Sequence, residues 1–230
     1  MKINLPQVIV SSDIPSEGYL TIIAGGRAPE SNWLKSAAHG SSVWVADHGI
    51  DICKSACITP ARIIGDGDSA SGAAWKWGHG LGVPMEEYPA KKDYTDTQIA
   101  LIRAKELAPN YQVLLTGAFG GRFDHAFSTI FSFASSGLNG CISDDKESCF
   151  FLNDGESLSF DIIQRPSAIS LLPMTKECTG VTSAGLYWPL TDAILHQSYP
   201  DAVSNVPVED SIHISIDKGT LAVYFVWDES

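Results

Sequence analysis

The stretch Arg62-Ile63-Ile64-Gly65-Asp66-Gly67-Asp68-Ser69 predicts the class of fold. A short apolar run ends here in a glycine-flanked turn with two carboxylates, and side chains two residues apart in an extended chain point to one side. Such a run is typical of a buried strand that delivers acidic groups at its carboxyl end, where open α/β sheets bind their ligands. Asp66 and Asp68 can therefore face one cation, and Mg²⁺ suits oxygen-only ligands. The alternative is an ordinary Asp-Gly turn with solvated carboxylates.

The sequence around this stretch has the alternation of strands and helices that is typical of a parallel α/β sheet. Several apolar, β-rich runs end in loops rich in Gly or Asp, and helix-length connections separate them. Residues 70–84 are rich in Gly and Trp, and their pattern predicts neither a helix nor a strand. The elements predicted for this half are strands at 19–24, 42–46, 61–64 and 111–115, an edge strand at 84–89, and helices at 32–39, 97–107 and 126–135.

The pattern changes beyond about residue 140, where alternation replaces helical periodicity. Asn153-Asp154-Gly155 and Lys218-Gly219 each predict a hairpin, the first between 149–152 and 157–162 and the second between 211–216 and 220–227. A mostly antiparallel β domain follows from this pattern. We therefore predict an α/β domain at 1–145 and a β domain at 146–230.

Composition and charge exclude several classes of protein. The chain has 230 residues, of which 44% are hydrophobic, so it can build a sizeable core. Its net charge of −12, without a Lys/Arg cluster, argues against nucleic acid as a partner. No apolar run approaches the ~20 residues of a membrane span, and the first residues lack the apolar region of a signal peptide. The five cysteines lack zinc spacing, which favours reduced thiols in the cytoplasm.

Five acidic residues are predicted to converge at the carboxyl edge of the sheet. Asp47, Asp66 and Asp68 follow strands, while Asp93 and Asp96 stand three residues apart at a helix start. Such a set can hold one or two Mg²⁺ ions, which would neutralise phosphate oxygens and draw a nucleotide to an acidic protein. For Asp96 the alternative is a simple helix cap, a position that Thr95 could also fill.

A glycine-rich loop and the basic residues near it are candidates for phosphate binding. The glycine-rich loop 117–121 lies between a strand and a helix, where backbone N–H groups can cradle phosphate, although it matches neither a Walker loop nor the dinucleotide fingerprint. Arg122 can make paired hydrogen bonds to phosphate oxygens, and His125 can act near neutral pH. Lys91 and Lys92 offer point charges for the same anion, the alternative being that they are ordinary solvated surface lysines. The competing account of Arg122 is a structural ion pair with Asp124.

Four motifs occur in a fixed order along the chain: Asp47-x-Gly49, Gly65-Asp66-x-Asp68-Ser69, Lys92-Asp93-x-Thr95-Asp96 and Gly117-x-x-Gly120-Gly121-Arg122-x-Asp124-His125. In this order and spacing they resemble the thiamine pyrophosphokinase family. The second half adds Ser183-Ala184-Gly185-Leu186-x-Trp188-Pro189-Leu190 and Ser204-Asn205, which are also similar to that family. The resemblance extends from about Ile22 to Ser204.

The resemblance implies an α/β nucleotide-binding catalytic domain followed by an antiparallel β-sandwich for thiamine binding and dimerisation. It implies a homodimer with thiamine at the subunit interface. The implied reaction is attack of the thiamine hydroxyl on the β-phosphorus of ATP, which yields thiamine diphosphate and AMP. Mg²⁺ is the implied cofactor and ATP the co-substrate.

The resemblance also implies the roles of individual residues. Asp66, Asp68, Asp93 and Asp96 would hold Mg²⁺ and, with Arg122 and His125, form the catalytic set. Trp188 would offer an aromatic face to thiamine, although a tryptophan is otherwise more often a core residue. The implied substrate-binding residues are Asp47, Gly49, Lys92, Gly117, Gly120, Gly121, Arg122, Asp124, Trp188, Ser204 and Asn205.

Three departures from the family pattern affect the pocket. Gly67 replaces a bulky apolar residue, which predicts a looser loop; His48 replaces a small residue; and the stretch before Ser204 lacks a glycine. Two other functions fit the same residues: a metal-dependent phosphohydrolase that activates water, and a non-catalytic sensor of thiamine or nucleotide. The sequence leaves the general base open between His125 and an aspartate.

Overall fold

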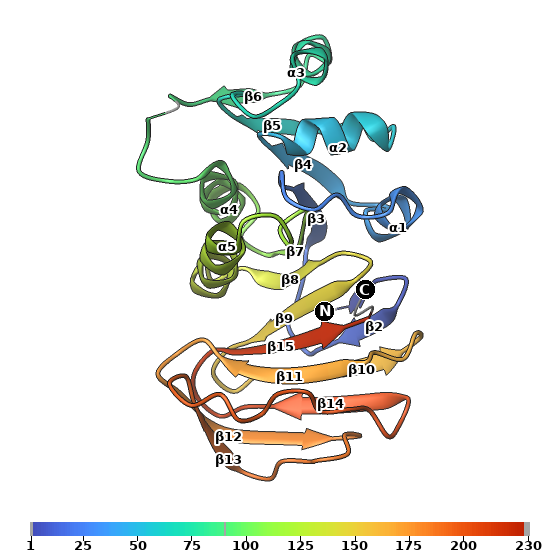
Figure 1. Cartoon of the computed structure of the whole chain (residues 1–230), viewed down its shortest axis with the longest axis vertical. Helices are drawn as coiled ribbons and strands as arrows, with labels where there is room; N and C mark the ends of the chain where they lie inside the picture. Colours follow the sequence, from blue (N-terminus) through green and yellow to red (C-terminus); the bar gives the residue numbers. More distant parts are fainter. Residues whose placement is uncertain (1, 90, 228–230) are drawn as a thin grey trace. The chain divides into compact units, whose positions relative to one another are not determined.

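The computed structural model describes residues 2–89 and 91–227, which form two compact units (Figure 1). One unit is Ser16–Asp144, and the other combines Met1–Pro15 with Asp145–Ser230. The expected first domain, 1–145, is therefore wrong for the first fifteen residues. β1 (Lys2–Asn4) pairs with β2 (Val8–Ser11), and β2 pairs with β10 (Ser157–Ile162) in the second unit. Strands of three and four residues carry too little alternation to reveal this partner.

The first unit is built on a parallel sheet, as predicted. Its strands run in the order β8-β7-β3-β4-β5-β6, and every neighbouring pair is parallel. The apolar runs predicted as strands are buried in this sheet because helices cover both of its faces. The strands are β3 (Gly18–Ile23), β4 (Ser42–Ala46), β5 (Arg62–Gly65), β6 (Met85–Glu87), β7 (Tyr111–Thr116) and β8 (Asn139–Ser143).

Helices α4 (Asp96–Leu107) and α5 (Phe123–Ser135) lie on one side of this sheet, and α1 (Ser31–Ala37) and α2 (Gly49–Ser55) lie on the other (Figure 1). α3 (Gly72–His79) packs beside α2 and occupies the segment that the sequence left unassigned. The chain adds β4, β5 and β6 on one side of β3 and then returns to place β7 and β8 on the other. Such a reversal opens a crevice at the carboxyl ends of the central strands.

The second unit contains two antiparallel sheets. One has the order β1-β2-β10-β14-β12-β13, and the other contains β11, β15 and β9 as neighbours. Phe160 of β10 contacts both Phe150 of β9 and Phe225 of β15, with ring centroids 5.2 and 5.1 Å apart, so residues of both sheets form one core. The remaining strands are β9 (Glu147–Leu152), β11 (Ala168–Pro173), β12 (Glu177–Ala184), β13 (Ala193–His196), β14 (Ser211–Ser215) and β15 (Leu221–Val226).

The predicted fold class, an α/β unit and an antiparallel β-sandwich, is confirmed, but both predicted hairpins are wrong. β9 pairs with β15, and β10 pairs with β14, so the turns at 153–155 and 218–219 carry the chain from one sheet to the other. Local turn signals do not distinguish a hairpin from such a crossing. Within the described residues, the helices are too short or too polar to span a membrane.

Candidate active site

A pocket of about 350 Å³ lies at the carboxyl ends of β3, β4 and β7, where the strand order reverses. The loops after these three strands form its walls, and the first turns of α4 and α5 complete it. The pocket brings together seven of the residues predicted from the sequence: Asp47, Asp96, Gly117, Gly120, Gly121, Arg122 and His125. This position is where open α/β sheets bind ligands.

The glycine loops allow close backbone contact at the pocket wall. Gly26 donates a hydrogen bond from its N–H to the carbonyl of Gly117, at 2.6 Å. Gly117 has φ of 66°, and a Cβ there would lie 2.3 Å from the carbonyl oxygen of Ala24. Only glycine fits this approach, and the result is a wall of backbone that can meet an anion without side chains in the way.

Three carboxylates gather beside this pocket. Asp47, Asp66 and Asp68 each offer an oxygen, and these oxygens lie within 4.8 Å of one another. The hydroxyl of Ser69 donates to Asp47, and the N–H of Asp68 donates to Asp66 Oδ1 at 3.1 Å, so the turn itself orients the group. Asp47 Oδ1 is buried and has no hydrogen-bond partner among the described residues. An oxygen-only set with an unsatisfied buried atom fits a hard divalent cation.

Lys92 brings a positive charge to these acidic residues. Its Nζ lies 2.5 Å from Asp66 Oδ2 and 3.3 Å from Asp96 Oδ2, and its side chain is only 14% exposed. The hydrogen bond from Lys92 lowers the pKa of Asp66, whereas the neighbouring Asp66 carboxylate raises the pKa of Asp68. Burial raises the pKa of Asp96, whose Oδ1 has no hydrogen-bond partner in the described part of the chain. Lys92 thus offsets part of the repulsion among these acids.

Replacing Lys92 with methionine is expected to destabilise the metal-free protein by about 1–3 kcal/mol, because Asp66 and Asp96 lose a charged hydrogen-bond partner. Added Mg²⁺ should recover more stability in this variant than in the wild type. Denaturant unfolding in EDTA and in Mg²⁺ measures both effects, with Lys91→Met, an exposed neighbour, as the control. If Lys92→Met loses the same stability with and without Mg²⁺, Lys92 and Mg²⁺ do not neutralise the same carboxylates.

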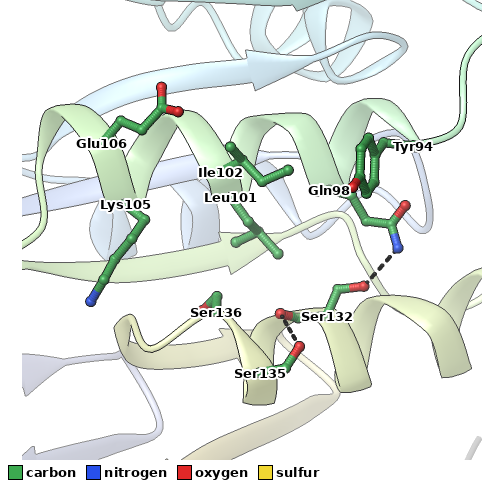
Figure 2. A pocket seen from close by; sticks show the side chains of 9 residues that line it. All are labelled: Tyr94, Gln98, Leu101, Ile102, Lys105, Glu106, Ser132, Ser135 and Ser136. Atoms are coloured by element: carbon green, nitrogen blue, oxygen red, sulfur yellow. Dashed lines mark hydrogen bonds between the residues drawn. The ribbon is translucent and has the colours of Figure 1, made fainter.

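Asp96 points into the site because another residue caps its helix. Thr95 is the N-cap of α4, with its hydroxyl accepting from Gln98 N and the Gln98 side chain accepting from Thr95 N. Gln98 also donates to Ser132 of α5, at 3.0 Å. These two residues line a separate pocket of about 390 Å³ between the two helices (Figure 2). The capping alternative for Asp96 is therefore wrong, and the helix start that carries it is tied to α5.

Arg122 and Asp124 form the ion pair that the sequence offered as an alternative. Arg122 Nε lies 3.0 Å from Asp124 Oδ1 and Nη2 lies 2.5 Å from Oδ2. Their side chains are 74% and 62% exposed, and an exposed pair contributes little to stability. Arg122 lines the pocket together with His125. The two N–H groups of Arg122 that now bond to Asp124 could instead bond to two oxygens of a phosphate.

Two predicted residues lie outside these contacts. Asp93 is exposed and is not among the carboxylates that the described structure brings within reach of one another. Gly49 opens α2 and is buried against the end of β3, where a Cβ would lie 2.0 Å from the carbonyl oxygen of Ile23. Its structural role is to bring α2, which follows Asp47, close to the sheet.

Replacing Gly49 with alanine is expected to lower the free energy of unfolding by about 3 kcal/mol, because a backbone carbonyl blocks the new methyl group. Gly72, the first residue of α3, is the control: it has open space around it, and alanine there should be neutral or stabilising. Urea unfolding of both variants makes the comparison. Similar stability for the two variants would contradict the packing described for Gly49.

The second unit contains its own pocket, of about 430 Å³, which Trp188 and Asn205 help to line. Asn205 Nδ2 donates to the carbonyl of Trp188 at 2.7 Å, and its Oδ1 accepts from Trp188 N at 3.1 Å. Trp188 is 59% exposed, so the alternative that it is a core residue is wrong. Ser204, with φ of 57°, donates from its N–H to Ser170 Oγ and is not among the residues that line the pocket.

Sequence reasoning missed several residues of the first pocket. Gly25 and Gly26 follow a predicted strand, so the rule that located Asp47 at a strand end could have found them. Thr129 lies one helical turn after His125, a spacing that also gives a signal. The residues that line the pocket and were not predicted as site residues are Ala24, Gly25, Gly26, Ala46, His48, Ser69, Thr95, Thr97, Ala118 and Thr129. Of these, His48, Ser69 and Thr95 lie within the motifs quoted above.

Together, these features define an α/β protein with a glycine-lined pocket beside an acidic group, joined to a β-sandwich unit. Family comparisons identify it further. The model described as thiamin pyrophosphokinase, catalytic domain, matches residues 34–141, and the one described as thiamin pyrophosphokinase, vitamin B1 binding domain, matches residues 159–221. The chain belongs to the thiamin pyrophosphokinase family.

Individual relatives agree with this placement. Thiamine pyrophosphokinase 1 of Oryza sativa subsp. japonica is 27% identical over 69% of this chain and 63% of its own length. Thiamine pyrophosphokinase of Bacillus subtilis (strain 168) is 24% identical over 88% of this chain and 95% of its own.

Solved structures show the same fold. The thiamine pyrophosphokinase structure from Bacillus subtilis has a TM-score of 0.80 at 21% identity, covering 91% of this chain and 99% of its own. The thiamin pyrophosphokinase structure from Candida albicans has a TM-score of 0.73 at 14% identity, covering 91% and 90%.

Proposed function

We propose that this protein catalyses Mg²⁺-dependent transfer of diphosphate from ATP to thiamine. The hydroxyl oxygen of thiamine forms a bond to the β-phosphorus, the bond from that phosphorus to the α,β-bridging oxygen breaks, and AMP leaves as the hydroxyl proton is removed. The observation that carries the proposal is the group Asp47, Asp66 and Asp68 beside the glycine-lined pocket. It lies in a chain whose halves match the catalytic and vitamin B1 binding models.

The proposed metal ligands are Asp66 and Asp68, with Asp47 and Asp96 beside them and Asp93 as a further candidate. When bound there, Mg²⁺ would neutralise phosphate oxygens during transfer. The loop 117–121 and Arg122 would bind the same phosphates through backbone N–H groups and a bidentate fork. Positioning and charge neutralisation of this kind suffice for phosphoryl-type transfer without a covalent nucleophile.

His125 or one of the pocket aspartates would take the proton of the thiamine hydroxyl. His125 lines the pocket on the first turn of α5, and Asp96 lines it on the first turn of α4. Both are therefore on rigid elements at the pocket wall, which is what a general base requires.

For thiamine, we propose that the exposed indole of Trp188 offers an aromatic face to the cationic ligand, with Ser204 and Asn205 as polar contacts. We also propose a cytoplasmic homodimer. Large apolar side chains exposed on the second unit, among them Tyr187 and Tyr199, support self-association. The free thiols of Cys53, Cys57, Cys149 and Cys178 support a reducing compartment.

The experiment is incubation of the pure protein with ATP, thiamine and Mg²⁺, with AMP and thiamine diphosphate followed together. Equal amounts of both products, lost with EDTA and restored by Mg²⁺, are expected. ADP or free phosphate formed without regard to thiamine would overturn the proposal in favour of a hydrolase. Binding of thiamine without any product would overturn it in favour of a sensor.

A further inference from the structure

The helix α3, which the sequence did not predict, is held beside the turn Asp66–Ser69, which carries two of the three clustered carboxylates. Ser71 caps it by accepting from Ala74 N at 3.1 Å, and Ser71 is in turn held by Asp51 of α2, which accepts from its N–H at 2.9 Å and from its hydroxyl. Ala74 and Gly78 are buried, the latter so closely that a Cβ would lie 3.0 Å from the Ile63 side chain of β5. These contacts fix both the position and the rotation of the helix.

This docking places the indole of Trp75 against Gly67, the residue between the two carboxylates. Gly67 has φ of 72°, and a Cβ there would lie 2.5 Å from Trp75 Cε2, 2.7 Å from Cδ2 and 2.8 Å from Cζ2. The ring also meets His79 edge-on, with centroids 5.9 Å apart, one turn along the same helix. The turn that glycine was expected to loosen is therefore covered by an aromatic ring.

We propose that Trp75 is a positioning residue for the metal-binding turn, an inference that rests on the proposed role of Asp66 and Asp68. The indole occupies the space that a side chain at position 67 would fill, and so opposes movement of the turn toward α3. The turn keeps its glycine conformation, in which Asp68 N donates to Asp66 Oδ1 and both carboxylates stay within reach of Asp47.

Trp75 would act by packing behind the proposed metal-binding residues. Asp68 is exposed, so few contacts of its own side chain hold it, and its position depends on the backbone at Gly67. A rigid ring on one side of that backbone reduces the number of turn conformations that compete with the binding one. Loss of residues that orient metal ligands typically weakens metal affinity or activity by about 10–100-fold.

The first test compares Trp75→Ala with Trp77→Ala by hydrogen exchange in the absence of metal. Trp77 is also half-buried and lies two positions further along α3, about 200° around the helix, so it is a matched control. Faster exchange of the Asp66–Ser69 amides is expected in Trp75→Ala alone, with the β4 amides unchanged. Equal exchange in the two variants, or faster exchange throughout the unit, would overturn the proposal.

The second test measures Mn²⁺ binding by electron paramagnetic resonance and the Mg²⁺ dependence of turnover. Trp75→Ala is expected to weaken Mn²⁺ binding about tenfold and to raise the Mg²⁺ requirement to a similar extent, with the KM for thiamine unchanged. Trp75→Phe, which keeps an aromatic face, should recover most of the binding. If the alanine variant binds Mn²⁺ like the wild type, or if phenylalanine restores nothing, Trp75 does not position the turn.

Activity of the wild type distinguishes failure of the proposed function from failure of the proposed role of Trp75. If it makes no thiamine diphosphate, the proposed function fails whatever Trp75 does. If the wild type is active and Trp75→Ala resembles Trp77→Ala, the function stands and the positioning role fails.

Discussion

Asparagine in place of Asp68 is expected to reduce formation of thiamine diphosphate by about 10³-fold while leaving the fold intact. Asp68 is exposed, so its replacement disturbs little packing. What it removes is a charge next to Asp47 and Asp66, at the point where the proposed Mg²⁺ would meet the phosphates of ATP. The measurement is kcat at saturating ATP and thiamine over a range of Mg²⁺ concentrations, with circular dichroism to check folding.

Asp13→Asn is the matched control for Asp68, because Asp13 is an exposed aspartate in the loop after β2. It should keep full activity. The metal-ligand role fails if Asp68→Asn retains wild-type turnover, since the acidic group would then have no part in the reaction.

Replacing Arg122 with lysine is expected to lower kcat/KM for ATP by about 10²-fold even though the positive charge is kept. Arginine makes two parallel hydrogen bonds to a phosphate, as it does to Asp124 in this structure, whereas lysine acts as a point charge. The effect should fall on ATP, with thiamine binding unaffected. Steady-state kinetics with each substrate varied in turn separates the two.

The control for this variant is Arg103→Lys on the same unit. Arg103 pairs with Glu86 and Glu106 rather than with the pocket, so its replacement should change kcat/KM by less than about twofold. Equal losses of kcat/KM in the two variants would contradict a phosphate-binding role for Arg122 and would leave it only its ion pair with Asp124.

The sequence predicts the sheet of the first unit well because its strands are continuous apolar runs. β3, β4, β5 and β7 are buried on both faces, and a continuous apolar run of this length is typical of a strand buried in a parallel sheet. The position of the site follows from the same logic. Asp47 and the loop 117–121 come directly after strands, and parallel strands bring their carboxyl ends to one edge.

Other features depend on contacts between distant segments and leave no local signal. The turns after β9 and β14 look like hairpin turns, but the pairing of β9 with β15 is what decides where the strands go. Lys92 meets Asp66 across 26 positions of sequence. The contact between Trp75 and Gly67 likewise needs α3 to be docked, and a short helix that begins with glycine has a weak sequence signature.

The most direct test of the central claim uses ATP labelled with ³²P at the β-phosphorus, incubated with the protein, thiamine and Mg²⁺. Diphosphate transfer predicts that all of the consumed label appears in thiamine diphosphate, that AMP is unlabelled, and that Asp68→Asn nearly abolishes the product. Label in ADP or inorganic phosphate, with unlabelled thiamine compounds, would contradict the account, because the pocket would then deliver phosphate to water or to another acceptor.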